Sequence, residues 1–465
     1  MNKSQKIILF LLSLCMFVVV LDSAIINLAL PAIKEALHFD DATLQWVVTS
    51  YILTFGGFLM LGGRTADLYG RRRVLILGLA GFTFCSFLIG FSTSSTMLIV
   101  LRALQGLAGA FMSPTALSIL LTSFEEGPAR NRALSIWSIV ASGGAAAGVF
   151  LGGVLTQYLG WQWCFFVNVP IGIAAIIGLK KYLPPHIKEA KDKILDVPGA
   201  ILITGGLITL VYGLTNASTA GWMAMSTLSS FGLSVILLAA FLFNETKSKH
   251  PLMPLSIFRL RNLVAGNLIM LPVIAGALGQ FFFLSLYIQN ILKYSPSISG
   301  IAFLPVPIII GIVSYNTPKL LRTFSAKQLT IAGVGLATFG VFLISLLGEQ
   351  SSYWLHLFPA FLFLAVGFGM SFVAITIAAT SGVPGDEAGL ASGLLGTAQQ
   401  VGGALGLAVL AVVANATTTV ILASAHNQTQ AIVAGYQHAF LTAASLMFIA
   451  WLVSIFVLQA PKNSH

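Results

Sequence analysis

The chain has 465 residues, of which 57% are hydrophobic and only 8% are charged, whereas about a quarter of the residues in a soluble domain are charged. This composition excludes an ordinary soluble protein and indicates one that crosses the membrane many times. The net charge of +10 comes from Lys and Arg scattered between apolar runs, which argues against a nucleic-acid partner and favours retention of basic residues in the cytoplasm.

Windows of about 20 residues predict fourteen membrane-spanning helices. In chain order these are 7–33, 46–68, 74–92, 97–122, 133–156, 162–182, 197–216, 225–245, 262–290, 298–318, 328–347, 353–379, 388–418 and 436–459. Because the number is even, both termini lie on one side of the membrane.

The basic residues indicate which side this is. A cytoplasmic amino terminus places 21 of the 24 Lys and Arg in inner segments, 2 outside and 1, Arg102, within a span. This bias is typical of cytoplasmic loops. We therefore expect a multi-pass protein of a bacterial inner or plasma membrane, with both termini cytoplasmic.

Two longer inner segments follow the sixth and eighth predicted helices and bracket a helix pair. They divide the chain into an amino-terminal six-helix half at 1–182, a linker with two extra transmembrane helices at 183–261, and a carboxy-terminal six-helix half at 262–465. Doubled six-helix halves with a substrate path between them are a recurrent plan of transporters.

One acidic residue, Asp22, interrupts the first apolar run at LDSAIINLALP. A carboxylate near the bilayer centre costs about 3 kcal/mol, so a retained one predicts ion or substrate handling. Arg102 is the other charged residue well inside a span, and the two can pair if the first and fourth helices are neighbours. We expect Asp22 to hold a proton or a substrate cation, and Arg102 to tune it.

Polar and aromatic residues of other spans are candidates for lining the path. They are Asn27, Tyr51, Gln105, Asn168, Gln280, Tyr287, Asn316, Gln399 and Gln400. The alternative for each is a hydrogen bond to a neighbouring helix, which is the commoner role of a polar side chain within a bundle.

Other chemistry finds little support in the sequence. Cys15, Cys85 and Cys164 lie in apolar runs without metal-ligand spacing, and we interpret them as packing residues. No phosphate-binding loop ending in Lys-Ser or Lys-Thr is present, and Asp22 has no second acid nearby. We expect no enzyme, no metal and no cofactor, and an ion gradient as the energy source.

The loop between the second and third predicted helices reads GGRTADLYGRRRVL and resembles the signature of the major facilitator superfamily, G-x-L-A-D-R-x-G-R-R/K. Thr65 and Leu68 depart from that signature. The resemblance implies a cytoplasmic gate in which Asp67 pairs with neighbouring basic residues, and the alternative is a simple positive-inside anchor. The predicted gate residues are Gly63, Asp67, Gly70, Arg71, Arg72, Arg130 and Arg132.

Further motifs resemble the fourteen-span drug:proton antiporters of that superfamily. They are LDSAIINLALP in the first helix, LRALQGLAGA in the fourth, WQWCFFVNVPIG in the sixth and GLASGLLGTAQQVGGALGLAVL in the thirteenth. The fifth helix reads GAAAGVFLGG, with Val149 where the antiporter motif has proline, so the proline bend is not expected. Its glycines predict a helix-packing face made of Gly144, Gly148, Gly152 and Gly153.

The resemblance implies an all-α polytopic membrane protein with the major facilitator fold. It also implies proton-coupled antiport that exports lipophilic, cationic drugs or toxic compounds by alternating access, as in multidrug efflux and antibiotic resistance. The expected partners are a small-molecule substrate, protons and the lipid bilayer, around a monomer. Three alternatives stay open: an exporter restricted to one metabolite, siderophore or antibiotic; coupling to sodium; and a membrane sensor that transports nothing.

Overall fold

The computed structural model describes residues 3–40, 43–124, 128–184, 195–248, 251–252, 259–321, 323–380, 388–424 and 427–459. Within these ranges the regular structure is entirely helical. Fourteen segments are long and apolar enough to cross a membrane. The predicted all-α class and the predicted number of spans are therefore confirmed.

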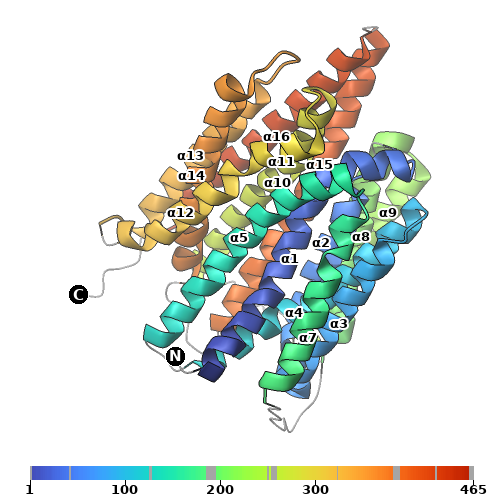
Figure 1. Cartoon of the computed structure of the whole chain (residues 1–465). Helices are drawn as coiled ribbons and strands as arrows, with labels where there is room; N and C mark the ends of the chain where they lie inside the picture. The colour runs from blue at the N-terminus through green and yellow to red at the C-terminus, as the bar shows by residue number, and fades with distance from the viewer. Residues whose placement is uncertain are drawn as a thin grey trace.

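The helices run side by side as one bundle (Figure 1). The first seven are α1 (Lys3–Ala36), α2 (Trp46–Tyr69), α3 (Arg71–Ile89), α4 (Ser95–Ser123), α5 (Pro128–Tyr158), α6 (Trp163–Phe166) and α7 (Asn168–Tyr182). A hairpin of α8 (Val197–Ala220) and α9 (Met225–Lys247) comes next. The last group is α10 (Arg261–Asn290), α11 (Pro296–Phe303), α12 (Pro305–Leu320), α13 (Ala326–Ser345), the π-helical turn η2 (Tyr353–Leu357), α14 (Phe358–Thr380), α15 (Ala388–Ser424) and α16 (Gln428–Phe456).

Local chemistry explains where several helices begin or break. Ser94 caps α4 by accepting a hydrogen bond from the Met97 backbone N–H, and Ser325 with Gln328 forms a capping box at the start of α13. Gly70, with a φ of 98°, provides the turn between α2 and α3, where other residues would be strained. The tenth span is divided at Leu304 into α11 and α12, because Pro305 has no N–H to continue the first helix.

Two groups of helices pack within themselves and against each other. In the first, α1 contacts α4, α5 and α7, while α2 and α3 contact α4; in the second, α10 contacts α15 and α16, and α13 contacts α14 and α16. The groups meet where α1 contacts α10, α2 contacts α15, and α5 contacts α11 and α12. Side chains near these contacts are therefore the ones that a relative movement of the groups would rearrange.

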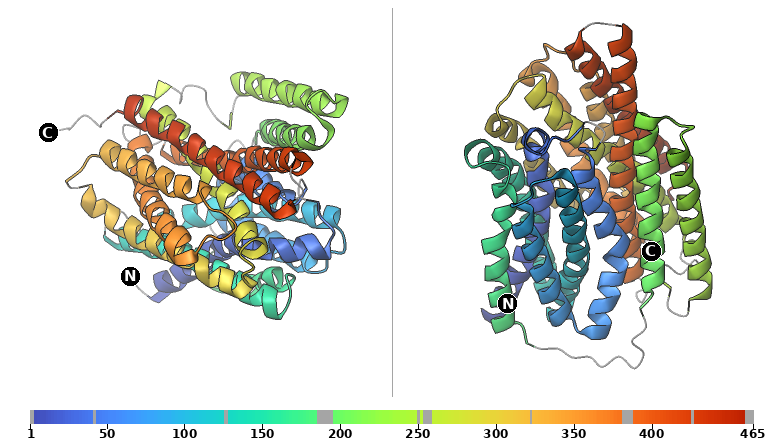
Figure 2. Two further views of the ribbon diagram at one scale, coloured as in Figure 1. Left: turned by 90° about the horizontal axis from the view of Figure 1, so that it is seen from above. Right: turned by 90° about the vertical axis from the view of Figure 1, so that its right-hand side faces the viewer.

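The α8–α9 hairpin lies at the edge of the molecule (Figure 2). Its inner helix α8 contacts both α2 and α15, whereas α9 contacts mainly α8. Gln45 at the start of α2 donates to the Thr215 hydroxyl of α8 at 2.9 Å. The hairpin thus covers the seam between the two groups on one side.

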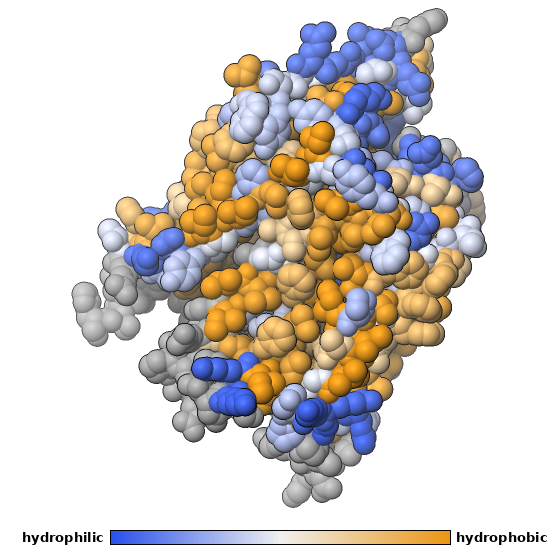
Figure 3. Space-filling view, viewed as in Figure 1, coloured by the Kyte–Doolittle hydropathy of each residue, from blue (hydrophilic) through white to orange (hydrophobic). Residues whose placement is uncertain are grey.

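The surface matches a protein that is embedded in lipid. Figure 3 shows a broad hydrophobic zone between polar residues that gather toward the two ends of the molecule. Large apolar side chains in mid-helix face outward, among them Phe84, Ile177, Val235 and Ile236. Such exposure would be costly in water, but it is favourable against hydrocarbon.

The glycines of α5 let two helices approach closely. A Cβ on Gly148 would lie 2.7 Å from the Leu21 carbonyl oxygen of α1, and one on Gly152 would lie 2.6 Å from the Ile25 carbonyl oxygen. Gly153 instead faces Pro296 of α11. The helix α5 continues through Val149 without interruption.

Candidate functional site

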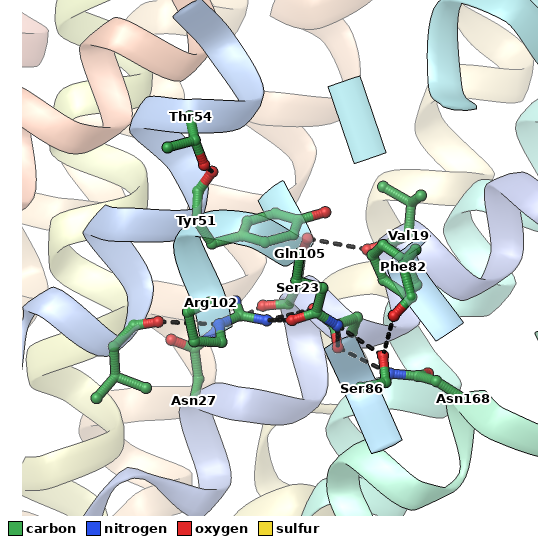
Figure 4. A network of polar contacts seen from close by, with 12 residues as sticks. Val19, Ser23, Asn27, Tyr51, Thr54, Phe82, Ser86, Arg102, Gln105 and Asn168 are labelled. Atoms are coloured by element: carbon green, nitrogen blue, oxygen red, sulfur yellow. Dashed lines mark hydrogen bonds and ion pairs between the residues drawn. The ribbon is translucent and has the colours of Figure 1, made fainter. Parts of the chain in front are cut away.

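The Asp22 side chain lies in the interior of the first helix group and is 0% exposed. Its Oδ2 is 2.6 Å from Arg102 Nη1 of α4. Its Oδ1 accepts hydrogen bonds from Gln105 Nε2 at 2.9 Å and from Asn168 Nδ2 at 2.8 Å. Each carboxylate oxygen therefore accepts from at least one donor of α4 or α7, and Figure 4 shows Arg102, Gln105 and Asn168 gathered at this point.

The Arg102 guanidinium is enclosed as fully, at 1% exposure. Besides the carboxylate, its Nη1 donates to Gln105 Oε1 at 2.6 Å, and its Nε donates to the Val47 carbonyl of α2 at 3.0 Å. The Tyr51 ring lies 4.3 Å from the guanidinium carbon, which is within cation–π range. A buried ion pair is tolerated only with such additional partners, because its desolvation is expensive.

Gln105 connects the charges to a neutral hydroxyl. Its Nε2 donates to Ser86 Oγ of α3 at 2.8 Å as well as to Asp22, and Ser86 donates in turn to the Phe82 carbonyl at 2.8 Å. If Asp22 takes up a proton, Arg102 keeps two neutral acceptors, the Val47 carbonyl and Gln105 Oε1. Arg102 therefore keeps hydrogen-bond acceptors whether Asp22 is charged or neutral.

The carboxylate does not face an open cavity in this structure. All its partners come from the first helix group, and they exclude water from it. The adjacent residue Ser23 is exposed, so only about one residue of helix separates the site from an accessible face. A drug cannot touch Asp22 directly unless the helices rearrange, so direct competition between a proton and a drug at this carboxylate requires that movement.

The structure brings five of the predicted site residues together: Asp22, Tyr51, Arg102, Gln105 and Asn168. The sequence interpretation missed Ser86 and the Val47 carbonyl. Serine is too common in membrane helices to be singled out, and a backbone carbonyl leaves no trace in a sequence. The only available signal was that both lie in predicted spans.

Among the remaining path candidates, Asn27 lies beside the ion pair (Figure 4), and the others lie on α10, α12 and α15. On α1, the Asn27 amide donates back to the Ser23 carbonyl at 3.2 Å. On α10, Tyr287 donates to the Gly348 carbonyl at 2.5 Å, and Gln280 is fully buried among the second helix group.

Three further candidates lie on α12 and α15. Asn316 on α12 is half-buried and accepts a hydrogen bond from Lys319 Nζ at 3.0 Å. Gln399 and Gln400 on α15 are half-buried, and Gln400 packs against Gly56 of α2, where the two helix groups meet. Gln400 thus lies at the seam between the groups, whereas the bond of Asn316 stays within α12.

The predicted gate is described in part. Arg71 Nη1 donates to Thr122 Oγ1 at 3.2 Å, and Arg72 Nη2 donates to the Lys180 carbonyl at 2.6 Å. These bonds tie the start of α3 to the ends of α4 and α7. The side chains of Asp67, Arg130 and Arg132 lie outside the described part of the chain, and so does their predicted pairing. Gly63 faces Pro114 of α4, with 3.7 Å from a Cβ placed there to the proline Cβ.

Comparison with known proteins decides the family. Residues 12–407 match the sequence profile of the Major Facilitator Superfamily. The chain belongs to this superfamily.

A group of three or more His, Cys, Asp or Glu placed to hold a metal ion is not found among the residues that the structure describes.

Curated relatives within the superfamily are resistance and export proteins. The puromycin resistance protein pur8 of Streptomyces alboniger is 37% identical over 446 residues. The alignment covers 95% of this chain and 87% of the pur8 chain. The cephamycin export protein CmcT of Amycolatopsis lactamdurans is 39% identical over 406 residues, covering 87% and 84%. The multidrug resistance protein Stp of Mycobacterium tuberculosis strain CDC 1551 is 31% identical over 415 residues, covering 88% and 76%.

Solved transporters of the superfamily share the fold at low sequence identity. An auto-inhibited peptide transporter of the POT family is 16% identical with a TM-score of 0.69, over 100% of this chain and 99% of that one. A D-xylose–proton symporter is 14% identical with a TM-score of 0.68, over 98% of each chain. The major facilitator fold and a multi-pass membrane location follow.

Proposed function

We propose that this chain is a secondary active exporter that moves lipophilic, cationic drugs out of the cell in exchange for protons. The observation that carries the proposal is the buried Asp22–Arg102 pair, whose neutral partners fit two charge states. The resistance and export roles named for its relatives support the substrate class. The chain supplies both helix groups that flank the path, and we propose that it works as a monomer with both termini in the cytoplasm.

The coupling step follows from the hydrogen bonds of Asp22. When the carboxylate is charged, it draws donors from α4 and α7 toward α1 and holds the three helices together. A proton on either oxygen weakens these charge-assisted bonds, because a neutral acid is a poorer acceptor than a carboxylate. Proton binding at Asp22 therefore loosens α1, and the loosened helix group can reorient.

The substrate site is proposed at the seam between the helix groups, near the half-buried Gln400 and Asn27. A drug there would interact with Asp22 through the position of α1 and not through direct contact. Such coupling is reciprocal: if protonation changes drug affinity, drug binding changes proton affinity by the same factor. Moving one charge through 100 mV supplies about 2.3 kcal/mol, enough for a roughly fifty-fold gradient of a neutral drug, whereas one-for-one exchange of a proton for a monovalent cation moves no net charge and is driven by the pH difference alone.

A second candidate is an exporter restricted to a single antibiotic. The relatives named for puromycin, cephamycin, tetracenomycin C and lincomycin favour it, whereas the relative named for multidrug resistance favours a broad range. Competition between unlike compounds for efflux separates the two. A broad exporter is inhibited by several chemical classes, and a restricted exporter by one.

The test is transport into inverted membrane vesicles with an imposed pH gradient. Native protein is expected to accumulate tetraphenylphosphonium when the vesicle interior is acidic, and Asp22→Asn is expected to lose this response. Glu349→Gln is the matched control, because Glu349 is an exposed acid in the loop between α13 and η2. Full pH-driven uptake by Asp22→Asn, or uptake by native protein that responds to a sodium gradient alone, contradicts the proposal.

A further inference from the structure

One contact between the helix groups depends on a proline in α1. Pro31 lies inside this helix and has no N–H, so the carbonyl of Asn27, four residues earlier, loses its normal helical partner. A free carbonyl within a membrane requires another donor, because hydrocarbon offers none. The Asn27 carbonyl must therefore accept a hydrogen bond from a donor outside the normal α1 ladder.

The second helix group supplies that donor. Ser285 Oγ of α10 donates to the Asn27 carbonyl at 2.5 Å. Gln289, one turn further along α10, donates through Nε2 to the Leu28 carbonyl at 3.3 Å and to Ser285 Oγ at 3.3 Å. Two neighbouring carbonyls of α1 are thus occupied by side chains of α10.

A second contact lies at the same end of the molecule. Gln157 Oε1, at the end of α5, accepts hydrogen bonds from the Ser297 N–H at 3.1 Å and from the Ser297 hydroxyl at 2.6 Å. Close packing supports these bonds, since a Cβ on Gly300 would lie only 2.7 Å from the Val149 carbonyl oxygen. The helix groups are therefore joined on both sides of α1 at the end where α1 and α10 finish.

A hollow of about 800 Å³ adjoins the α1–α10 contact. Pro31 and Gln289, which belong to the contact, also line the hollow, together with Ala32, Asn290 and Pro296. Its lining also includes charges of both signs from Lys34, Glu35 and Asp40, together with the His38 imidazole. The predicted topology places this end outside the cell, so the hollow lies where cargo would leave.

We propose that Ser285 and Gln289 form a latch that closes the exit by binding two neighbouring α1 carbonyls, one of which, that of Asn27, has lost its helical partner to Pro31. Release of these two bonds separates α1 from α10 and joins the hollow to the space between the helix groups. The role as an exit rests on the proposed export function. The latch itself is a property of the fold and can be measured without transport.

The test measures the spacing of α1 and α10 with spin labels at Ala36→Cys and Asn290→Cys, two exposed positions at the ends of these helices. The three native cysteines are buried, and they are replaced by alanine in the background. Native protein is expected to populate mainly one short distance. Ser285→Ala/Gln289→Leu is expected to raise the ratio of long to short distances about tenfold, which corresponds to about 1.4 kcal/mol and is within the range that two hydrogen bonds contribute.

A second variant leaves both latch side chains in place. Pro31→Ala gives the Asn27 carbonyl an N–H of its own helix, and it is expected to shift the distances in the same direction. The matched control is Ser445→Ala, whose exposed hydroxyl bonds only its own helix, at the Leu441 carbonyl, and which is expected to change nothing.

Unchanged distances in both the double variant and Pro31→Ala overturn the latch. A shift produced equally by Ser445→Ala overturns it as well. Because no pH gradient or drug is present, failure of the proposed antiport leaves these distances as predicted, and the two proposals are tested separately.

Discussion

The buried ion pair is the costliest feature at the scale of single residues. Taking two charges out of water costs several kcal/mol per ion, and only close geometry with further hydrogen bonds repays that cost. Asp22 has three donors, and Arg102 has acceptors beyond the carboxylate. Stability alone does not require such a pair, because apolar residues of similar volume often serve as well. Its presence is best explained by a change of charge during the cycle.

This explanation predicts an unequal pair of variants. Arg102→Ala leaves a buried acid without its cation and is expected to destabilise the protein by about 3–5 kcal/mol. The double variant Asp22→Asn/Arg102→Ala removes both charges and is expected to be more stable than Arg102→Ala. Thermal unfolding in detergent measures the order. A double variant that is less stable than Arg102→Ala would contradict the assignment of the pair as a charge-compensated unit.

Most residues of this site could be predicted from the sequence, but their arrangement in space could not. Asp22, Arg102 and Gln105 stand out because charged and amide side chains are rare and expensive inside spans. Their contact with Asn168 and Ser86 depends on how α1, α3, α4 and α7 pack, which hydropathy does not contain. For the same reason, the sequence suggested an Asp22 exposed to cargo, whereas the structure encloses it.

At the scale of helices, small residues decide which helices meet. Gly148 and Gly152 place α5 directly against the α1 turn that carries Asp22. Spans could be predicted because about 20 apolar residues suffice to cross a bilayer. The breaks at Leu304 and Val167 were not predicted, since each lies inside a continuous apolar run, although Pro305 was a local signal for the first.

Two glycines of α5 provide a matched comparison. A Cβ on Gly148 would lie 2.7 Å from both Ala24 Cβ and the Leu21 carbonyl oxygen, whereas one on Gly143 would meet nothing within 4 Å. Gly148→Ala is expected to lower stability by about 1–3 kcal/mol through overpacking. Gly143→Ala is expected to be neutral or to stabilise the helix slightly. Equal melting temperatures for the two variants would contradict close α1–α5 packing.

At the scale of the whole molecule, alternating access requires the contacts between the two helix groups to break and form again. The α8–α9 hairpin has a polar anchor to the first group through Gln45 and Thr215, and α8 also touches α15 of the second. The division into six, two and six helices remains a prediction about how these parts move. The basic-residue bias, which the fold leaves untested, predicts the orientation of the whole chain.

Orientation can be tested at the two ends of α9. Met223 lies in the turn between α8 and α9 and is 86% exposed, whereas Thr246 is exposed at the opposite end of α9. In intact cells, Met223→Cys is expected to react with a membrane-impermeant maleimide, and Thr246→Cys is expected to react only after permeabilisation. The opposite pattern would place the termini outside and reverse the proposed direction of export.

Drug binding and proton binding at Asp22 are proposed to weaken each other through the position of α1. Proton release from purified protein in a weakly buffered detergent solution measures this most directly, as tetraphenylphosphonium is added in the presence of a pH indicator dye. Native protein is expected to release up to about one proton per chain with a saturating dose dependence, and Asp22→Asn is expected to release none. Equal release by both proteins, or binding to the native protein without any release, would contradict the account.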